Sequence, residues 1–158
     1  IKMKINYEIL KPFGPSIFKV KIPEEIVNSL NDYVDSMVSN ENKSKEFNHG
    51  EHLVGDVTQE LKIEKDFMIK CGWGAFLGKC VKQWMKDTTG KEVKNIQFLS
   101  SWVVRQFENE YNPTHWHGGH ISGAGFLKVP SSLGKNTQDK KNRNYYGGCL
   151  QFIHGQKC

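Results

Sequence analysis

The alternation of apolar and polar residues predicts two strands and then a helix in the first part of the chain. Strands are expected over residues 1–10 and 16–22, and the second alternates strictly between apolar and polar side chains. Pro23 suits the first position of a helix, and apolar residues then recur with the 3.6-residue spacing of one helical face. These residues are Ile26, Val27, Leu30, Tyr33, Val34, Met37 and Val38. We therefore expect an amphipathic helix that packs through this stripe.

A second helix is expected over residues 64–89, after a polar loop over residues 39–50 and a weak strand over residues 52–61. Gly90 is a typical helix stop signal. The helical segment contains three glycines, Gly72, Gly74 and Gly78. Each lowers helix stability by about 1 kcal/mol relative to alanine, so we expect close packing against another element to offset the loss.

Strand patterns replace the helical ones from residue 95 onward. Strands are expected over residues 96–107, 121–129 and 145–153. Two helices followed by a run of strands predict an α+β fold, in which the helices cover one face of a largely antiparallel sheet. The chain has 158 residues, enough for one core of ordinary size, so we expect a single domain over residues 1–158.

The composition excludes several classes of protein. Hydrophobic residues make up 37% of the chain and charged residues 25%, which is typical of a globular domain and not of a disordered one. A transmembrane helix needs about 18 consecutive apolar residues, and the sequence has no such run. The first residues also lack the apolar stretch of a secretory signal. We expect a cytoplasmic protein with no membrane partner, and the four cysteines, which form no CxxC pair, as free thiols.

The net charge is mildly positive. The sequence has 22 Lys and Arg residues against 17 Asp and Glu residues, which gives a formal charge of +5. Part of this excess lies over residues 135–143, where basic residues alternate with asparagines and no aromatic residue intervenes. Such a run is typical of a solvated loop, so a nucleic-acid partner is not expected.

A histidine cluster is the most informative feature of the sequence. His115, His117 and His120 are three of six histidines and fall within six residues. On a strand, side chains two residues apart share a face, so His115 and His117 can converge on one ion, and imidazole nitrogens suit Zn, Fe, Cu or Ni. The alternative is a polar turn, begun by residues 112–113 and bent at residues 118–119. The extended approach before proline and the bare glycines beside the pair favour the metal site.

The same region carries three short motifs in a fixed order. His115-Trp116-His117 follows Tyr-Asn-Pro, a Ser-Gly segment then ends in Phe-Leu-Lys-Val-Pro, and Gly-Cys-Leu-Gln-Phe occupies residues 148–152. Residues 102–154 thereby resemble a family of 2-oxoglutarate/Fe(II)-dependent oxygenases found in tailed phages and marine bacteria. Residues 53–55 resemble a weaker upstream element of the same family.

The resemblance implies a double-stranded β-helix, or jelly-roll, core that binds Fe(II) and oxidises a substrate with 2-oxoglutarate and O2. It assigns the metal ligands to His115 and His117, with His120 as the alternative if a turn presents the second ligand. His117 stands where the wider superfamily has Asp or Glu, which raises the charge of the site by one. The family's third ligand and the basic residue that pairs with 2-oxoglutarate lie in later segments that are not present here, and His154 is given no ligand role.

The strand count leads to the same expectation. A jelly roll needs two sheets of several strands, whereas only three or four strand candidates follow the second helix. We therefore expect a jelly roll that is incomplete at its C-terminal end, buttressed by two helices and belonging to a longer protein. The open sheet edge over residues 149–153 predicts pairing with another chain, as in a homodimer.

Four residues are candidates for the surroundings of a cosubstrate or substrate. They are Tyr111, Asn112, Arg105 and Lys128. A guanidinium such as that of Arg105 can bind a carboxylate with two hydrogen bonds, although a surface salt bridge is its ordinary role. Lys128 is equally compatible with a sheet surface, and Trp102 is expected in the core. Two other functions stay open: a cupin-like metal-binding protein that does not use 2-oxoglutarate, and a non-catalytic phage interaction module.

Overall fold

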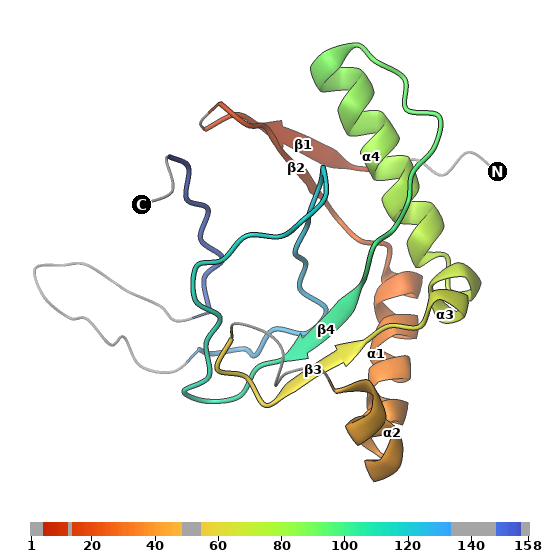
Figure 1. Ribbon diagram of the computed structural model, residues 1–158, viewed down its shortest axis with the longest axis vertical. Helices are drawn as coiled ribbons and strands as arrows, with labels where there is room; N and C mark the ends of the chain where they lie inside the picture. Colours follow the sequence, from red (N-terminus) through yellow and green to blue (C-terminus); the bar gives the residue numbers. More distant parts are fainter. Residues whose placement is uncertain (1–4, 13, 49–54, 134–147, 156–158) are drawn as a thin grey trace, which may run out of the picture. The chain divides into compact units, whose positions relative to one another are not determined.

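The computed structural model describes residues 5–12, 14–48, 55–133 and 148–155 (Figure 1). The chain forms two compact units, Ile1–Ser122 and Gly123–Cys158. The helices and strands that the structure describes belong to the first unit. In chain order they are β1 (Tyr7–Leu10), β2 (Ile17–Val20), α1 (Glu24–Val38), α2 (Glu41–Phe47), β3 (Gln59–Lys62), α3 (Lys65–Lys70), α4 (Trp73–Thr89) and β4 (Trp102–Arg105). None of these helices is long and apolar enough to span a membrane.

The first two strands form an antiparallel hairpin, which confirms the expectation of strands in this region. Tyr7 lies opposite Val20, and its ring stacks on Phe18 with 4.7 Å between ring centroids. The Tyr7 hydroxyl donates a hydrogen bond of 2.6 Å to Asp87 near the end of α4. Phe18 also lies beside Trp84 of α4, at 6.4 Å between ring centroids. Aromatic packing and a hydrogen bond therefore fasten the hairpin to the last turns of α4.

Helix α1 buries the stripe that the sequence predicts. The buried side chains are Ile26, Leu30, Val34 and Met37. Val34 and Met37 form one cluster with Leu61 of β3, whose side chain is fully buried. Tyr33 joins the helix to the region of α3, because its ring stacks on Phe67 and its hydroxyl donates a hydrogen bond of 2.8 Å to Glu64. The core of the first unit thus lies between α1 and the β3–β4 ribbon.

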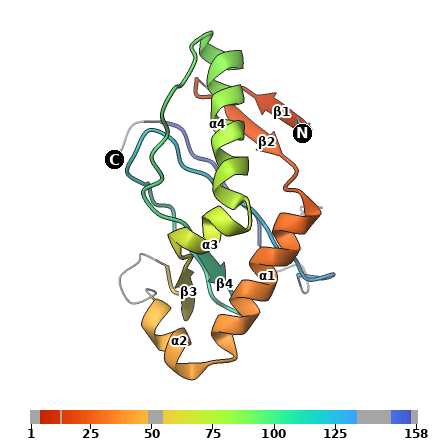
Figure 2. The same ribbon diagram turned by 90° about the vertical axis from the view of Figure 1, so that its right-hand side faces the viewer.

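The expected helix over residues 64–89 is wrong as a single element, because it is two helices, α3 and α4 (Figure 2). The break falls at Gly72, whose φ of 78° lies in the left-handed region that glycine adopts without steric cost. Gly72 also caps α4, since its carbonyl accepts a hydrogen bond of 2.9 Å from the Phe76 N–H. The predicted stop at Gly90 is confirmed by its φ of 70°.

Helix α2 corrects the expectation of a polar loop over residues 39–50. Its residues are almost all polar, so the segment has no apolar stripe to reveal a helix. Asn40 begins it, because its side-chain oxygen accepts a hydrogen bond of 3.1 Å from the Asn42 N–H and its carbonyl accepts one of 2.8 Å from the Ser44 N–H. Phe47 at the end of α2 packs against the core cluster.

Strands β3 and β4 pair antiparallel, with Gln59 opposite Arg105 and Glu60 opposite Val104. The face with Leu61 packs on α1. Along the edge of β3 that does not pair with β4, the Asn48 side chain makes hydrogen bonds with the strand backbone. Its oxygen accepts a hydrogen bond of 3.1 Å from the Glu60 N–H. The Asn48 amide also donates one of 3.0 Å to the Thr58 carbonyl.

The later strands are predicted largely wrongly. Of the expected strand over residues 96–107, only Trp102–Arg105 is a strand, and residues 121–129 contain none. Of the expected strand over residues 145–153, residues 148–153 contain none, and residues 145–147 lie outside the described residues. An apolar pattern becomes a strand only where a neighbour completes the hydrogen-bond ladder, and within the described ranges these residues have no such neighbour. The sheets that the structure describes are therefore two antiparallel pairs, and the jelly-roll core stays a prediction.

Candidate metal centre

The chain runs from the end of β4 to the histidine cluster along a segment that is bonded to residues before β3. Beyond β4, Asp56 and Tyr111 form a bridge with backbone hydrogen bonds of 2.9 and 3.3 Å. The Glu110 carboxylate fastens the turn before it, because it accepts hydrogen bonds from the Thr58 hydroxyl at 2.6 Å and from the Phe107 N–H at 2.8 Å. These hydrogen bonds hold the pKa of Glu110 below its usual value. These hydrogen bonds therefore fix the position of Tyr111, from which the chain continues to the histidines.

Asn112, the next residue, lies against the backbone of Gly55. A Cβ atom built on Gly55 would stand 1.9 Å from the Asn112 side-chain oxygen. Only glycine allows this approach unless the Asn112 side chain moves. The contact ties the start of the histidine cluster to residues upstream of β3.

The imidazoles of His115 and His117 lie together. Their Nε2 atoms are 3.2 Å apart, and the rings are perpendicular with 4.7 Å between centroids. The Nδ1 atom of His115 lies 2.7 Å from the Pro113 carbonyl oxygen, which accepts but cannot donate a hydrogen bond. This assigns the proton of a neutral His115 to Nδ1 and leaves a lone pair on Nε2, which faces His117.

The distance between the two Nε2 atoms suits two ligands of one ion. Metal–nitrogen bonds of about 2.0–2.1 Å place two neighbouring ligand nitrogens about 2.9–3.4 Å apart in octahedral or tetrahedral geometry. The observed 3.2 Å between His115 and His117 falls in that range and equally suits a hydrogen bond between the rings. The carbonyl of Pro113 is the kind of outer partner that orients a metal-binding histidine.

The expected convergence of the two rings is present, but they do not lie on a strand. Residues 112–117 are irregular, and both histidines are exposed. His120 is also exposed, and the structure does not bring it to the other two. The rings therefore converge from an irregular segment between the proline and the glycine pair, where the sequence favoured an extended strand.

Trp102 corrects a further expectation, because it is not a core residue. Its side chain is 36% exposed, and its ring lies 5.3 Å from the His117 ring. Side chains alternate along β4, so Trp102 occupies the face opposite Val103, which packs on the α1 cluster. The histidine pair therefore lies over the face of the ribbon that α1 leaves uncovered.

The predicted surroundings of the cosubstrate are divided between the two units, with Arg105, Tyr111 and Asn112 in the first and Lys128 in the second. Arg105 donates a hydrogen bond of 2.7 Å to Gln59 and lies over the Phe107 ring, so the expected salt bridge is replaced by a neutral partner. This contact lies on the ribbon face opposite Trp102. Tyr111 is 57% exposed, and its backbone forms the bridge with Asp56. Lys128 is exposed and belongs to the second unit.

Glu60 is a residue of this region that sequence reasoning missed. Its side chain is only 3% exposed, yet its Oε2 atom has no hydrogen-bond partner among the described residues. Burial raises the pKa of the Glu60 carboxyl above its usual value, while His115 acts on it in the lowering direction. The local sequence carries no signal for this, because a glutamate within a weak strand pattern is more commonly solvated.

The residues that the structure describes contain no group of three His, Cys, Asp or Glu side chains placed to hold an ion together. His154 is exposed and lies in the second unit. The chain matches no family model, no curated protein and no solved structure. The case for a metal at His115 and His117 therefore depends on their geometry and on the motifs around them.

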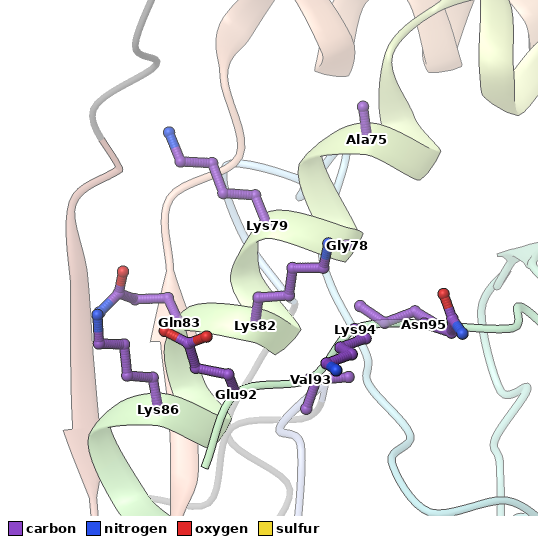
Figure 3. A pocket seen from close by; sticks show the side chains of 11 residues that line it. Ala75, Gly78, Lys79, Lys82, Gln83, Lys86, Glu92, Val93, Lys94 and Asn95 are labelled. Carbon is purple, nitrogen blue, oxygen red and sulfur yellow. The ribbon is translucent and has the colours of Figure 1, made fainter. Parts of the chain in front are cut away.

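A groove of about 840 Å³ lies away from the histidines, between α4 and the segment that follows it (Figure 3). Four lysines line it, Lys79, Lys82, Lys86 and Lys94, with one acidic residue, Glu92. Most of these ammonium groups are on exposed side chains. The groove therefore offers a diffuse positive field to anions and lacks the buried polar groups of a defined ligand site.

Proposed function

We propose that this protein is a 2-oxoglutarate/Fe(II)-dependent oxygenase, or a close derivative of one, that hydroxylates a substrate through iron held by His115 and His117. The observation that carries the proposal is the 3.2 Å approach of their Nε2 atoms, with the other nitrogen of His115 facing a carbonyl. The resemblance of residues 102–154 to such oxygenases supports the choice of iron and 2-oxoglutarate. The jelly-roll core is part of the same proposal.

The chain's own residues would prepare the site before any ion binds. The Pro113 carbonyl holds His115 with its Nε2 lone pair free, and the ring of Trp102 covers one side of His117. Both effects reduce the freedom that the imidazoles lose on binding, which favours affinity. When bound, the iron and its cosubstrate supply the oxidising chemistry, while the protein supplies orientation.

A cupin-like metal-binding protein that does not use 2-oxoglutarate is the second candidate. One observation favours it: the Arg105 guanidinium, which could bind the cosubstrate carboxylate, bonds Gln59 on the opposite face of the ribbon. A site of two imidazoles without a basic partner is suited to metal binding but not to holding a dicarboxylate. Succinate release therefore separates the two candidates.

The experiment is metal analysis of protein purified without oxygen, followed by a 2-oxoglutarate assay. We expect about one iron per chain, a loss of at least tenfold in His115→Ala/His117→Ala, and no loss in His154→Ala, which removes an exposed histidine of the second unit. Iron with 2-oxoglutarate-dependent succinate release supports the oxygenase, and metal without succinate supports the cupin-like protein. Absence of metal from the parent protein, or equal metal in the double variant, refutes both and favours a non-catalytic interaction module.

A further inference from the structure

The strongest unexplained feature of the first unit is the buried carboxylate of Glu60. Glu60 is only 3% exposed, and its Oε2 atom has no hydrogen-bond partner among the described residues. Its backbone N–H is satisfied, because it donates a hydrogen bond of 3.1 Å to the Asn48 side chain. Buried carboxylates in proteins are almost always hydrogen-bonded, paired with a cation or bound to a metal.

The strand register shows which face Glu60 occupies. Glu60 pairs with Val104 and Lys62 pairs with Trp102, so Glu60 and Trp102 are diagonal neighbours on one face of the ribbon. Diagonal neighbours of this kind have Cα atoms about 7–8 Å apart. Leu61 and its partner Val103 occupy the other face, against α1. The carboxylate of Glu60 therefore belongs to the face from which Trp102 contacts His117.

The electrostatics agree with this placement. Burial raises the pKa of Glu60, and the charge of a nearby His115 acts on it in the lowering direction. His115 in turn lies 3.2 Å from His117, whose ring lies beside Trp102. Glu60, Trp102 and the two histidines thus form one neighbourhood, assembled from β3, β4 and the turn at residues 112–117.

We propose that Glu60 supplies the carboxylate of the metal site formed by His115 and His117. The inference depends on the proposed function, and it assigns the anionic ligand to β3 instead of the position two residues after His115. Two imidazoles and one carboxylate form a common site for Fe(II), and a divalent cation would compensate the buried charge of Glu60. Since no three such groups lie within reach of one ion in the described arrangement, the Glu60 side chain must change rotamer on binding.

The test is titration of the full chain with Co(II), a spectroscopic substitute for Fe(II), followed by calorimetry and by visible absorption. Glu60→Gln keeps the size of the side chain and removes its charge. We expect Co(II) to bind this variant about 10–100-fold more weakly than the parent, with a changed absorption spectrum. Glu108→Gln is the matched control, because Glu108 is an exposed carboxylate on the turn after β4, and its affinity should equal that of the parent.

The outcomes distinguish this inference from the proposed function. If the parent binds Co(II) and Glu60→Gln binds it equally well with the same spectrum, Glu60 is not a ligand although the histidine site stands. If the parent does not bind Co(II), both are refuted. Circular dichroism and urea denaturation of Glu60→Gln show whether it is folded, and Glu60→Asp, which keeps the charge on a shorter side chain, should recover part of the affinity. A failure of Glu60→Asp to exceed Glu60→Gln in affinity counts against a charged ligand.

Discussion

Replacing Glu60 by leucine is expected to stabilise the protein when chelator keeps metals away. Leucine has a similar size, and the position is buried, since Glu60 is only 3% exposed. A buried polar atom without a partner costs about 1–3 kcal/mol, which leucine does not incur. Taking about 2 kcal/mol, and a denaturant dependence of about 2 kcal/mol per molar urea, Glu60→Leu should raise the urea midpoint by about 1 M at pH 7.

The pH dependence makes this prediction specific. Burial raises the folded-state pKa of Glu60 above its usual value, so ionisation at higher pH destabilises the fold relative to the unfolded chain. The penalty is present at pH 7 and disappears below the unfolded pKa, where both states are protonated. The advantage of leucine should therefore shrink as the pH falls from 7 to about 4.

The assay is urea denaturation in chelator, followed by circular dichroism at pH 7 and pH 4. Glu108→Leu serves as the control, because Glu108 is exposed and such a change is usually neutral within about 0.5 kcal/mol. A lower midpoint for Glu60→Leu at pH 7 would show that the carboxylate has a partner in the fold, and a gain of the same size at both pH values would show that its charge does not cause the cost. The reasoning about an orphaned charge would then be wrong.

Two further predictions concern the fold. Leu61→Ala should cost about 2–5 kcal/mol of unfolding free energy, because Leu61 is 0% exposed. Ile69→Ala, at a position that is 68% exposed, should change the unfolding free energy by less than about 0.5 kcal/mol. Similar urea midpoints for the two variants would contradict the core assignment. Gly72→Ala should destabilise by about 1–2 kcal/mol, since the φ of Gly72 is 78°. Gly78→Ala, with no atom nearer than 4.0 Å to its new Cβ, should stabilise α4 by about 0.5–1 kcal/mol, and thermal shifts of equal sign would count against the break at Gly72.

Helix α1, the end of α4 and the first two strands were the parts of the fold that the sequence could predict. The spacing of apolar residues is a local property, so the stripe of α1 and the end of α4 at Gly90 follow from nearby residues alone. The break at Gly72 was harder, because three glycines lie in the segment and only Gly72 has the left-handed backbone that separates the helices. Helix α2 was missed because its residues are polar and it contributes only Phe47 to the core cluster.

The strands and the candidate site depend on residues far apart in the chain. β4 forms where β3 is available to pair, and the similar patterns after residue 120 find no partner in the described part of the chain. The adjacency of His115 and His117 could be predicted from their spacing, although an irregular segment and not a strand carries them. Glu60 could not be predicted, because its burial depends on a register between residues about forty positions apart.

The Asn48 side chain affects which edge of the β3–β4 ribbon another strand can join. Its amide bonds the backbone at Thr58 and Glu60, so the outward side of β3 is already occupied there. An extended peptide joining at β3 would have to displace both hydrogen bonds, whereas one joining at β4 would not. Sheet growth at this ribbon is therefore favoured on the β4 side, and among the described residues Asn48 is what opposes mispairing between copies at β3, the usual hazard of an open strand.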